Sequence, residues 1–331
     1  MAGLGIDLGT ANTVVWTPKR GAVYDEPSVL VLREAARGRP RVAALGLEAR
    51  ALVGRAPQGY TAIRPLQDGV ITDLETARVY LASVLRRLLP RRWQRARLRA
   101  VVGVPAGATT LERRALTEAA EEARLRRVSL VAEPIAGALG SGLDPMRRRM
   151  QMVVDVGGGT AEVTAFCYGG VVAHRSCRVA GDEMTLAVYR YLRDQHGLIV
   201  GELTAEDVKI RAAGEEDPSL VVEGRDAASG RPRLLTVDVQ EIGRAVEPVV
   251  DSIIQALASC LDDLPGQGIG DVLADGVLAF GGGALLLGFG QRLEKALGFP
   301  VRIAEEPLTC VARGAAECLS RPELLRVQPM A

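Results

Sequence analysis

Apolar and polar positions follow two different periods along this chain. Short runs rich in β-branched residues, typical of buried strands, cover residues 4–8, 13–16, 28–32, 99–104, 128–133, 151–156, 162–166, 170–174 and 275–280. Between them, apolar residues recur at helical spacing over residues 74–89, 109–125, 182–196, 240–263 and 309–320. Thr109 and Thr110 are suited to cap the second of these helices, and Pro90 ends the first. Strands that alternate with helices in this way predict an α/β fold.

Length and composition add a division into domains and exclude several classes of protein. A chain of 331 residues predicts two domains, and because no low-complexity linker divides it, we expect a broad interface between them. A net charge of +1 gives no global attraction to nucleic acid. The most apolar long window, residues 272–290, contains Asp275 and six glycines, which makes it a poor membrane span. No secretory signal opens the chain, because Asp7 interrupts the first apolar run.

Cysteine and histidine contribute no candidate chemistry. The five cysteines include no C-x-x-C pair, which favours buried free thiols in a reduced cytosol. The two histidines, His174 and His196, are too few for a zinc site. We therefore expect ordinary packing or surface roles for all of them.

A repeated phrase carries the strongest chemical signal. DLGT (7–10) and DVGGGT (155–160) each place an Asp at the end of an apolar run, 148 residues apart (155 − 7), and each is followed by a return strand. Glycine lets backbone N–H groups approach phosphate oxygens, and a carboxylate at the strand end suits Mg²⁺ held through water. Two such hairpins facing each other would clamp a triphosphate in a cleft between domains. The simpler alternative is that each glycine stretch is only a turn.

A third glycine cluster, LAFGGGALLLGFG (278–290), follows another apolar run. Gly281, Gly282 and Gly283 have no side chains, so a flat adenosine can pack against their backbone. Neither G-x-x-x-x-G-K-[ST] nor G-x-G-x-x-G occurs in the chain, which excludes the two commonest rival nucleotide motifs.

Beyond these motifs, the chain resembles the bacterial actins of the MreB (rod-shape-determining) family, within the actin/Hsp70/sugar-kinase superfamily. The resemblance covers essentially the whole chain, in the family's order. It is carried by GIDLGTANT (5–13), EPSV (26–29), AIRPLQDGVITD (62–73), VGVPAGATTLERRAL (102–116), AEPIAGALGSGL (132–143), VVDVGGGTAEVT (153–164), RVAGDEM (178–184), GELTAEDVK (201–209), GGGALL (281–286) and EEPLTCVARGAA (305–316). Kinases and chaperones of the superfamily would share the phosphate loops but not AIRPLQDGVITD or EPLTCVARG.

The resemblance implies an actin-like α/β fold, with two ribonuclease-H-type domains that each carry an inserted smaller subdomain and with ATP and Mg²⁺ in the central cleft. By that pattern, residues 1–31, 75–142 and 315–331 form the first large domain, and residues 32–74 form its small subdomain. Residues 143–181 and 246–314 form the second large domain, and residues 182–245 form its small subdomain.

The resemblance also implies a set of site residues. The first phosphate loop comprises Gly9, Thr10, Ala11, Asn12 and Thr13, and the second comprises Gly157, Gly158, Gly159 and Thr160. Asp7 and Asp155 are the expected Mg²⁺ residues, through water. The adenosine is expected to contact Glu202, Glu206, Lys209, Gly281, Gly282, Gly283 and Ala284.

Glu133 and Thr160 are the expected catalytic pair. Glu133 precedes Pro134 and matches the family's water-orienting glutamate; a carboxylate near the γ-phosphate can orient a water for in-line attack. The alternative for Glu133 is a surface-loop carboxylate. Two departures from the family's pattern stand beside this pair, since Ala132 replaces a glutamate and Ala161 replaces a threonine. We therefore expect intact binding and slower hydrolysis.

The stretch RRLLPRRWQRARLR (86–99) combines seven arginines with interleaved apolar residues and contains no acid. Arginines attract anionic lipid, and tryptophan prefers the membrane interface. Leu88, Leu89 and Trp93 are the expected membrane contacts, at the place of the family's apolar insertion loop. Because the first phosphate loop begins at residue 5, we expect no N-terminal amphipathic helix. A solvated loop is the alternative, and a nucleic-acid patch is less favoured.

The function implied is that of a filament-forming, slowly hydrolysing ATPase in the cytoplasm, on the inner face of the plasma membrane. Its expected partners are further copies of itself in paired protofilaments, an anionic membrane surface, and membrane proteins of cell-wall synthesis or shape; no nucleic-acid partner is expected. The alternatives are a divergent paralogue that binds ATP as a static scaffold and a non-polymerising ATPase or kinase. For a sugar kinase or a chaperone, the chain offers no sugar pocket, catalytic Asp base or substrate-binding domain.

Overall fold

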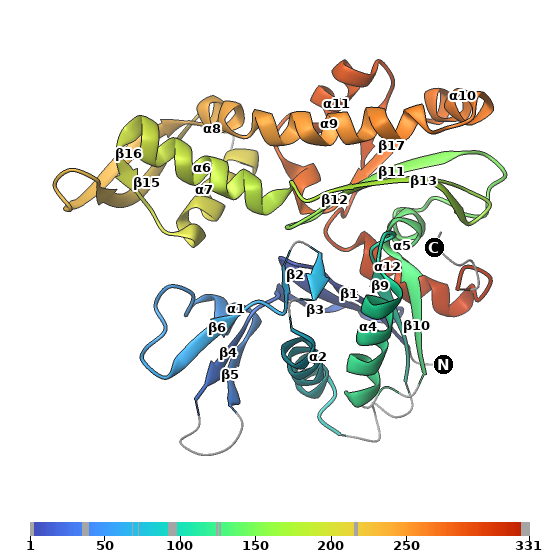
Figure 1. Ribbon diagram of the computed structural model, residues 1–331, viewed down its shortest axis with the longest axis horizontal. Coiled ribbons are helices and arrows are strands. Elements are labelled where there is room, and N and C mark those ends of the chain that lie inside the picture. Colours follow the sequence, from blue (N-terminus) through green and yellow to red (C-terminus); the bar gives the residue numbers. More distant parts are fainter. Residues whose placement is uncertain are drawn as a thin grey trace.

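The computed structural model describes residues 3–34, 40–67, 69–71, 73–91, 98–123, 125, 127–214 and 218–325. The chain forms two lobes, shown stacked in Figure 1, and each lobe is built on a five-stranded mixed sheet. Elements from β1 to the first residue of α5, Glu133, form lobe I, and elements from β11 to β18 form lobe II. Helices α5 and α12 lie between the two large sheets.

Lobe I contains the sheet β10-β9-β1-β2-β3, in which β1, β2 and β3 are antiparallel and β9 and β10 run parallel to β1. A smaller sheet, β5-β4-β6, and a short hairpin extend from it. The strands are β1 Gly3–Leu8, β2 Asn12–Thr17, β3 Gly21–Pro27, β4 Leu30–Arg33, β5 Arg41–Leu45, β6 Tyr60–Ile63, β7 Leu66–Gln67, β8 Val70–Ile71, β9 Arg99–Val104 and β10 Arg127–Ala132. The helices are α1 Gly46–Arg50, α2 Leu74–Leu88 and α4 Thr110–Glu122.

Lobe II contains the sheet β13-β12-β11-β17-β18, in which β11, β12 and β13 are antiparallel and β17 and β18 run parallel to β11. A smaller sheet, β14-β15-β16, extends from this lobe. The strands are β11 Gln151–Val156, β12 Ala161–Cys167, β13 Gly170–Cys177, β14 Leu198–Ile199, β15 Ser219–Asp226, β16 Pro232–Asp238, β17 Val277–Phe280 and β18 Val301–Ile303. The helices are α6 Gly181–His196, α7 Glu202–Gly214, α8 Val239–Ala245, α9 Glu247–Asp262, α10 Gly266–Asp275, the 3₁₀ turn η1 Gly282–Leu285 and α11 Phe289–Leu297.

The two large sheets therefore repeat one topology, an antiparallel meander followed by two parallel strands. In both, the first strand of the meander is central, and its neighbours are the second strand on one side and a parallel strand on the other. The repeated DLGT and DVGGGT phrases lie at the same place in the two sheets, in the turns that join β1 to β2 and β11 to β12. The sequence repeat is thus the visible part of a structural duplication.

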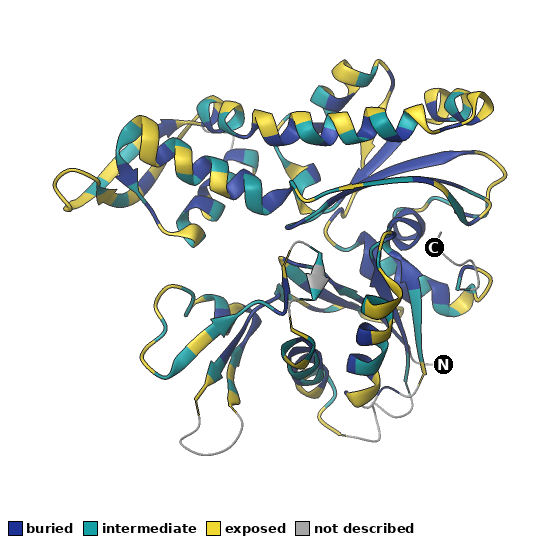
Figure 2. Ribbon diagram, in the orientation of Figure 1, coloured by how far each residue is buried: buried dark blue, intermediate teal, exposed yellow. Residues whose placement is uncertain are grey.

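Helices α5 (Glu133–Gly140) and α12 (Cys310–Glu317, continued by the 3₁₀ turn η2 Cys318–Ser320) join the lobes. They touch backbone to backbone, since a Cβ added at Gly314 would lie 1.8 Å from the carbonyl oxygen of Ala136. Phe280 of β17 packs on Gly137 of α5, where an added Cβ would lie 2.1 Å from the Phe280 ring. These helices share one buried core with residues of both sheets (Figure 2). The broad interface expected from the missing linker is therefore present.

The structure confirms most expected elements and corrects one. The Thr109 side chain caps α4 in a capping box with Glu112, as expected from sequence. The single helix expected over residues 240–263 is wrong: α8 ends at Ala245, and α9 begins at Glu247. Pro248 lies in the first turn of α9, where a missing N–H costs nothing, whereas inside a continuous helix its ring would clash with the carbonyl of Arg244.

Candidate functional site

The first glycine turn is held rigid by polar contacts within lobe I. The Gly9 N–H donates to the Asn12 carbonyl at 3.1 Å, which closes the turn between β1 and β2. Ser28 donates from its hydroxyl to the Gly9 carbonyl at 2.6 Å, and it also lies 2.8 Å from the buried Thr13 hydroxyl. The hydroxyl of Thr10 accepts the Gly69 N–H from the β7–β8 hairpin at 3.0 Å. Thr13 is thus a structural partner of Ser28, and Thr10 connects the turn to the small hairpin.

The second glycine turn has the same backbone geometry. The Gly157 N–H donates to the Thr160 carbonyl at 2.9 Å, and the strand pairs flanking the turns correspond, Leu8 with Thr13 and Val156 with Ala161. Position by position, Thr160 is therefore equivalent to Asn12, and Thr10 is equivalent to Gly158. The two threonines of the repeated phrase occupy different places in their turns.

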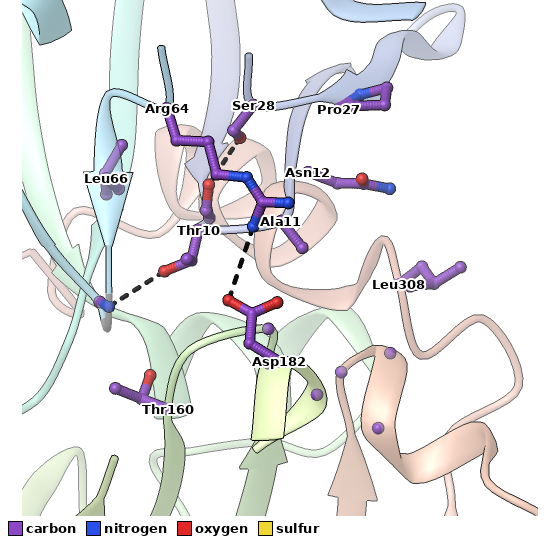
Figure 3. A pocket seen from close by; sticks show the side chains of 18 of the residues that line it. Thr10, Ala11, Asn12, Pro27, Ser28, Arg64, Leu66, Thr160, Asp182 and Leu308 are labelled. Carbon is purple, nitrogen blue, oxygen red and sulfur yellow. Dashed lines mark hydrogen bonds and ion pairs between the residues drawn. The ribbon is translucent and has the colours of Figure 1, made fainter. Parts of the chain in front are cut away.

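The two turns face each other closely across the boundary between the lobes. A Cβ added at Gly158 would lie 2.7 Å from the Cβ of Ala11 and 3.2 Å from its backbone nitrogen. In Figure 3, Thr10, Ala11 and Asn12 on one side and Thr160 on the other border the same opening. Glycine at position 158 is therefore required by the approach of the turns.

A cavity of about 1140 Å³ lies between the lobes at these turns. Its volume exceeds the range typical of small-ligand pockets, and its lining extends to Arg50 of α1 and to α6 and α7. The expected site residues that line it are Asp7, Gly9, Thr10, Ala11, Asn12, Glu133, Asp155, Gly157, Gly158, Thr160, Glu202, Glu206, Lys209, Gly281, Gly282 and Gly283. Of the residues expected at the nucleotide site, Thr13, Gly159 and Ala284 lie outside this lining and are buried.

Four carboxylates from the two lobes meet at the floor of this cavity. Burial and the neighbouring Asp25 raise the pKa of Asp7 to about 7. Burial, then Asp7, Glu162 and Asp155, raise the pKa of Glu133 well above its ordinary value. The pKa of Asp155 is raised for the same reasons, burial first and then Asp7 and Glu162. Such mutual repulsion makes the floor a strong attractor for a cation.

Mg²⁺ is the cation whose chemistry suits this floor. In the described ranges, no group of three or more His, Cys, Asp or Glu side chains is placed to ligate a metal ion directly. Mg²⁺ accepts such an arrangement because it prefers carboxylate oxygens and keeps several of its waters. Asp7 and Asp155 are the next-to-last residues of equivalent strands, one from each lobe, so they are the residues that would hold it through water.

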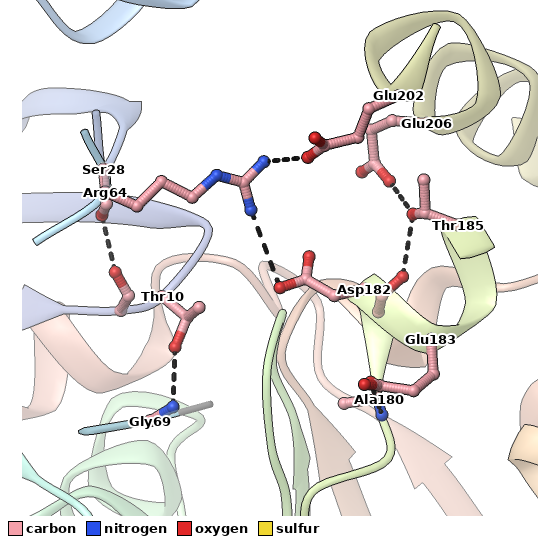
Figure 4. A network of polar contacts seen from close by, with 12 residues as sticks. Thr10, Ser28, Arg64, Gly69, Ala180, Asp182, Glu183, Thr185, Glu202 and Glu206 are labelled. Atoms are coloured by element: carbon pink, nitrogen blue, oxygen red, sulfur yellow. Dashed lines mark hydrogen bonds and ion pairs between the residues drawn. The ribbon is translucent and has the colours of Figure 1, made fainter. Parts of the chain in front are cut away.

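The far end of the cavity is lined by residues of α6 and α7. The Lys209 ammonium donates to the Gly181 carbonyl at 3.0 Å and to the Thr185 hydroxyl at 3.1 Å, and it pairs with Glu206 at 2.7 Å. Thr185 also donates to Glu206 (Figure 4). Lys209 is mostly buried by these contacts. It therefore holds α6 and α7 together at this end of the cavity and also places a positive charge there.

An arginine from lobe I reaches across the cavity mouth. Arg64 pairs with Glu202 and, at 3.7 Å, with Asp182, as the dashed lines in Figure 4 show. Both carboxylates belong to lobe II, so these ion pairs cross from lobe I to lobe II. The groups are more than one-third exposed, so the pairs are individually weak.

The third glycine cluster forms one wall. Gly281 has φ +85°, which favours glycine, and a Cβ on Gly283 would lie 2.3 Å from Val156. Gly282 lies against Leu308, whose side chain is 43% exposed at the cavity edge. Together they offer a flat, apolar surface of the kind expected for an adenosine.

Sequence reasoning missed four functional candidates: Ser28, Arg64, Thr185 and Glu162. The first three lie within or next to stretches that carry the family resemblance, but their contacts span 19 to 138 residues along the chain and no local pattern reveals them. Glu162 is 5% exposed on β12, opposite Asp155 in the strand register. Its position two residues after Thr160, in the return strand of the second glycine motif, was the available signal.

The expected membrane contacts are described only in part. Leu88 and Leu89, at the end of α2, are partly buried and pack against the core of lobe I. Arg86 bonds within its own helix, and Arg87 pairs with Glu26 and Glu48. Trp93 lies outside the described residues, so the membrane contact stays a prediction. In the described part of the chain, no helix combines the length and apolar character that crossing a bilayer requires.

Comparison with known proteins places this geometry in a family. The family model described as MreB/Mbl protein matches residues 1–327. The chain is 40% identical over 321 residues to the cell shape-determining protein MreB of Escherichia coli (strain K12), covering 96% of this chain and 92% of that protein. It is similar to MreB5 of Spiroplasma citri bound to AMPPNP, with a TM-score of 0.89, 28% identity and 97% of each chain covered. It is also similar to MamK in a double helical filament, with a TM-score of 0.79, 25% identity and coverage of 96% and 98%. The fold is therefore actin-like.

Proposed function

The chain belongs to the MreB/Mbl protein family of cell shape-determining, actin-like proteins, and from that premise we propose that it is an ATP-dependent, filament-forming ATPase. Its filaments lie on the inner face of the cytoplasmic membrane and organise cell shape or wall synthesis. The observation that carries the proposal is the pair of equivalent glycine turns, one from each duplicated sheet, facing each other over a floor of four carboxylates. The AMPPNP-bound MreB5 neighbour supports a nucleotide in the same cleft.

In this function, the Gly9 and Gly157 N–H groups close the two turns, and the backbone N–H groups of Thr10 to Asn12 and of Gly158 to Thr160 bind the phosphates from two sides. Asp7 and Asp155 hold Mg²⁺ through water, and Mg²⁺ supplies neutralisation of phosphate charge. The purine lies on Gly281 to Gly283, and Glu202, Glu206 and Lys209 surround the ribose. Because binding joins both lobes, it favours the closed cleft.

For hydrolysis, Glu133 orients the attacking water at the cavity floor, with Thr160 as a second contact. Both line the cavity, one from each lobe. Burial and the neighbouring carboxylates raise the pKa of Glu133, which makes its ionised form a stronger proton acceptor, and a bound cation would favour that ionised form. Ala132 and Ala161 remove a neighbouring carboxylate and hydroxyl, so we propose slow turnover.

Self-association is proposed from the family and from the MamK double helical filament, whose subunit this chain matches in fold. Membrane attachment is proposed from the basic, apolar stretch 86–99 at the end of α2. A second candidate function, a static ATP-bound scaffold, is favoured by the two alanine departures alone.

Electron microscopy on an anionic lipid monolayer tests the proposal. Purified protein with Mg-ATP should form double filaments that lie flat on the lipid, and Mg-ADP should give fewer. Filaments that never release phosphate would favour the static scaffold. Monomers under both conditions would refute filament formation.

The membrane loop has its own test. Leu89→Ser combined with Trp93→Ser should abolish co-flotation with anionic liposomes and leave filaments in solution intact. Leu111→Ser, at a 77% exposed leucine outside the stretch, is the matched control. Unchanged co-flotation of the double variant would refute this assignment.

A further inference from the structure

The turn that follows β9 rests on lobe II and forms a polar connection at the cavity floor. The Ala106 N–H of this turn donates to Glu162 Oε2 of β12 at 3.1 Å, and the Glu162 side chain is buried. A Cβ added at the next residue, Gly107, would lie 3.3 Å from His174 Nε2 of β13. Lobe I is thus bonded to lobe II at Ala106 and packed against it at Gly107.

This connection lies between the two groups assigned to water orientation. Thr160 is the last residue of the turn before β12, Glu162 is the second residue of that strand, and both line the cavity. On lobe I, Ala132 of β10 pairs in parallel with Val104 of β9, two residues before Ala106. The next residue after Ala132 is Glu133, whose Cγ lies 3.1 Å from the position of a Cβ on Gly103.

We propose that Glu162 is a positioning residue for hydrolysis: by accepting the Ala106 N–H across the lobe boundary, it sets the separation between Glu133 and Thr160. This inference rests on the ATPase function proposed above. Its physical basis is the short structural connection between Glu133 and Thr160. That connection consists of the ends of β9 and β10, the Ala106–Glu162 hydrogen bond and the start of β12. A displacement of about 1 Å in a reacting geometry costs up to about 100-fold in rate, so one such bond is sufficient to matter.

Glu162 acts in this proposal as a hydrogen-bond acceptor, and its negative charge is not required. Glu162→Gln keeps an acceptor oxygen of the same reach. Glu162→Met keeps the unbranched shape and removes the acceptor, which leaves the Ala106 N–H without its partner. The matched control is Thr164→Val, a buried position on the same side of β12 whose hydroxyl bonds His174 at 3.0 Å and which does not line the cavity.

The first readout is phosphate release at saturating Mg-ATP and matched filament mass, with ATP affinity measured separately. Glu162→Met should lower kcat about tenfold or more while the Kd for ATP changes less than about threefold. Glu162→Gln should retain kcat within about twofold, and Thr164→Val should match the wild type. A wild-type rate for Glu162→Met overturns the proposal. A Glu162→Gln variant as slow as Glu162→Met also overturns it, because charge would then be the property required.

The second readout is hydrogen exchange of the Ala106 amide, with a non-hydrolysable ATP analogue bound. Exchange should accelerate at least tenfold in Glu162→Met and should remain slow in Glu162→Gln. If the wild type releases no phosphate, the ATPase function fails and the positioning role fails with it, while slow exchange at Ala106 still shows that the connection exists. If the wild type hydrolyses ATP but the Ala106 amide exchanges equally in all variants, the positioning role alone is refuted.

Discussion

The two glycine hairpins, β1–β2 and β11–β12, have the same backbone and different chemistry. Both turns close with a hydrogen bond from their first glycine to the carbonyl three residues later. In both, the next-to-last residue of the first strand is an aspartate whose pKa is raised by burial. Opposite Asp7 in the strand register lies Val14, whereas opposite Asp155 lies Glu162. At the end of the turn, Asn12 in the first hairpin corresponds to Thr160 in the second.

This difference shows what duplication preserved and what it left free to diverge. The cradle for phosphate is a backbone property, so glycine and turn geometry suffice for it in both hairpins. Thr160, the side chain proposed to act on water, and Glu162, which bonds the other lobe, occur in the second copy only. We therefore propose that both hairpins bind ATP and that hydrolysis depends mainly on the second, with Glu133 facing it from lobe I.

The largest effect is expected where the hairpins approach each other. Gly158→Val would place its side chain against Ala11, where even a Cβ would lie 2.7 Å from another carbon, and would hold the turns apart. ATP affinity, measured by fluorescence titration, should fall at least 100-fold. The control is Gly243→Ala in α8, which has open space around it and should bind ATP as the wild type does. Near-normal affinity for Gly158→Val would show that the two turns do not clamp one ligand.

The equivalent positions Asn12 and Thr160 separate binding from catalysis. Thr160→Ala should lower kcat about tenfold with little change in the Kd for ATP, because its hydroxyl acts on the water. Asn12→Ala should instead weaken binding several-fold and leave kcat nearly unchanged. Single-turnover phosphate release, with a separate binding titration, gives both numbers. Equal effects of the two changes on kcat would contradict the asymmetry.

The extra carboxylate of the second hairpin predicts a pH dependence of stability. Burial raises the pKa of Glu162 to about 7, so the folded state binds its proton more tightly than the unfolded state does. The free energy of unfolding of nucleotide-free protein should therefore fall as pH rises from about 4.5 to 7 and stay low above it. Between pH 5.5 and pH 8, the loss should be smaller in Glu162→Gln, by on the order of 1–2 kcal/mol. Urea unfolding in EDTA measures it, and identical pH profiles would refute this cause.

The smallest effect is expected at the cavity mouth, where the ion pairs that cross between the lobes are exposed to solvent. Arg64→Ala removes ion pairs to Asp182 and Glu202 that are largely solvent-exposed, so each contributes less than about 1 kcal/mol. The dissociation rate of ATP should rise about two- to fivefold, and the effect should shrink at high salt. Arg114→Ala, which loses only a surface pair with Glu118 on α4, is the control. A 100-fold faster dissociation would place the clamp at the mouth instead of at the hairpins.

Local sequence predicted the parts of the fold that local physics determines. The aspartates, the glycine turns and the strands around them were visible because a buried strand and a tight turn each require particular residues. The sheet strands β15 and β16 were missed because their outer face is exposed and alternates charged with apolar residues. The break at Val246 was missed because the helical pattern continues through Pro248.

The site was predictable to the same extent. Residues that line the cavity through short motifs were named correctly as neighbours in space, although their roles remain proposals. Glu162 accepts a hydrogen bond from Ala106, 56 residues earlier, and Arg64 pairs with Glu202, 138 residues later. Contacts of that separation arise only when the duplicated lobes pack together.

The most direct measurement is a structure of this protein with Mg²⁺ and a non-hydrolysable ATP analogue. We expect the β- and γ-phosphates between residues 9–12 and 157–160, in contact with backbone N–H groups of both turns, with the ion joined to Asp7 and Asp155 through water. Phosphates held by one hairpin alone, or a nucleotide bound outside the cavity between the lobes, would contradict the two-sided clamp.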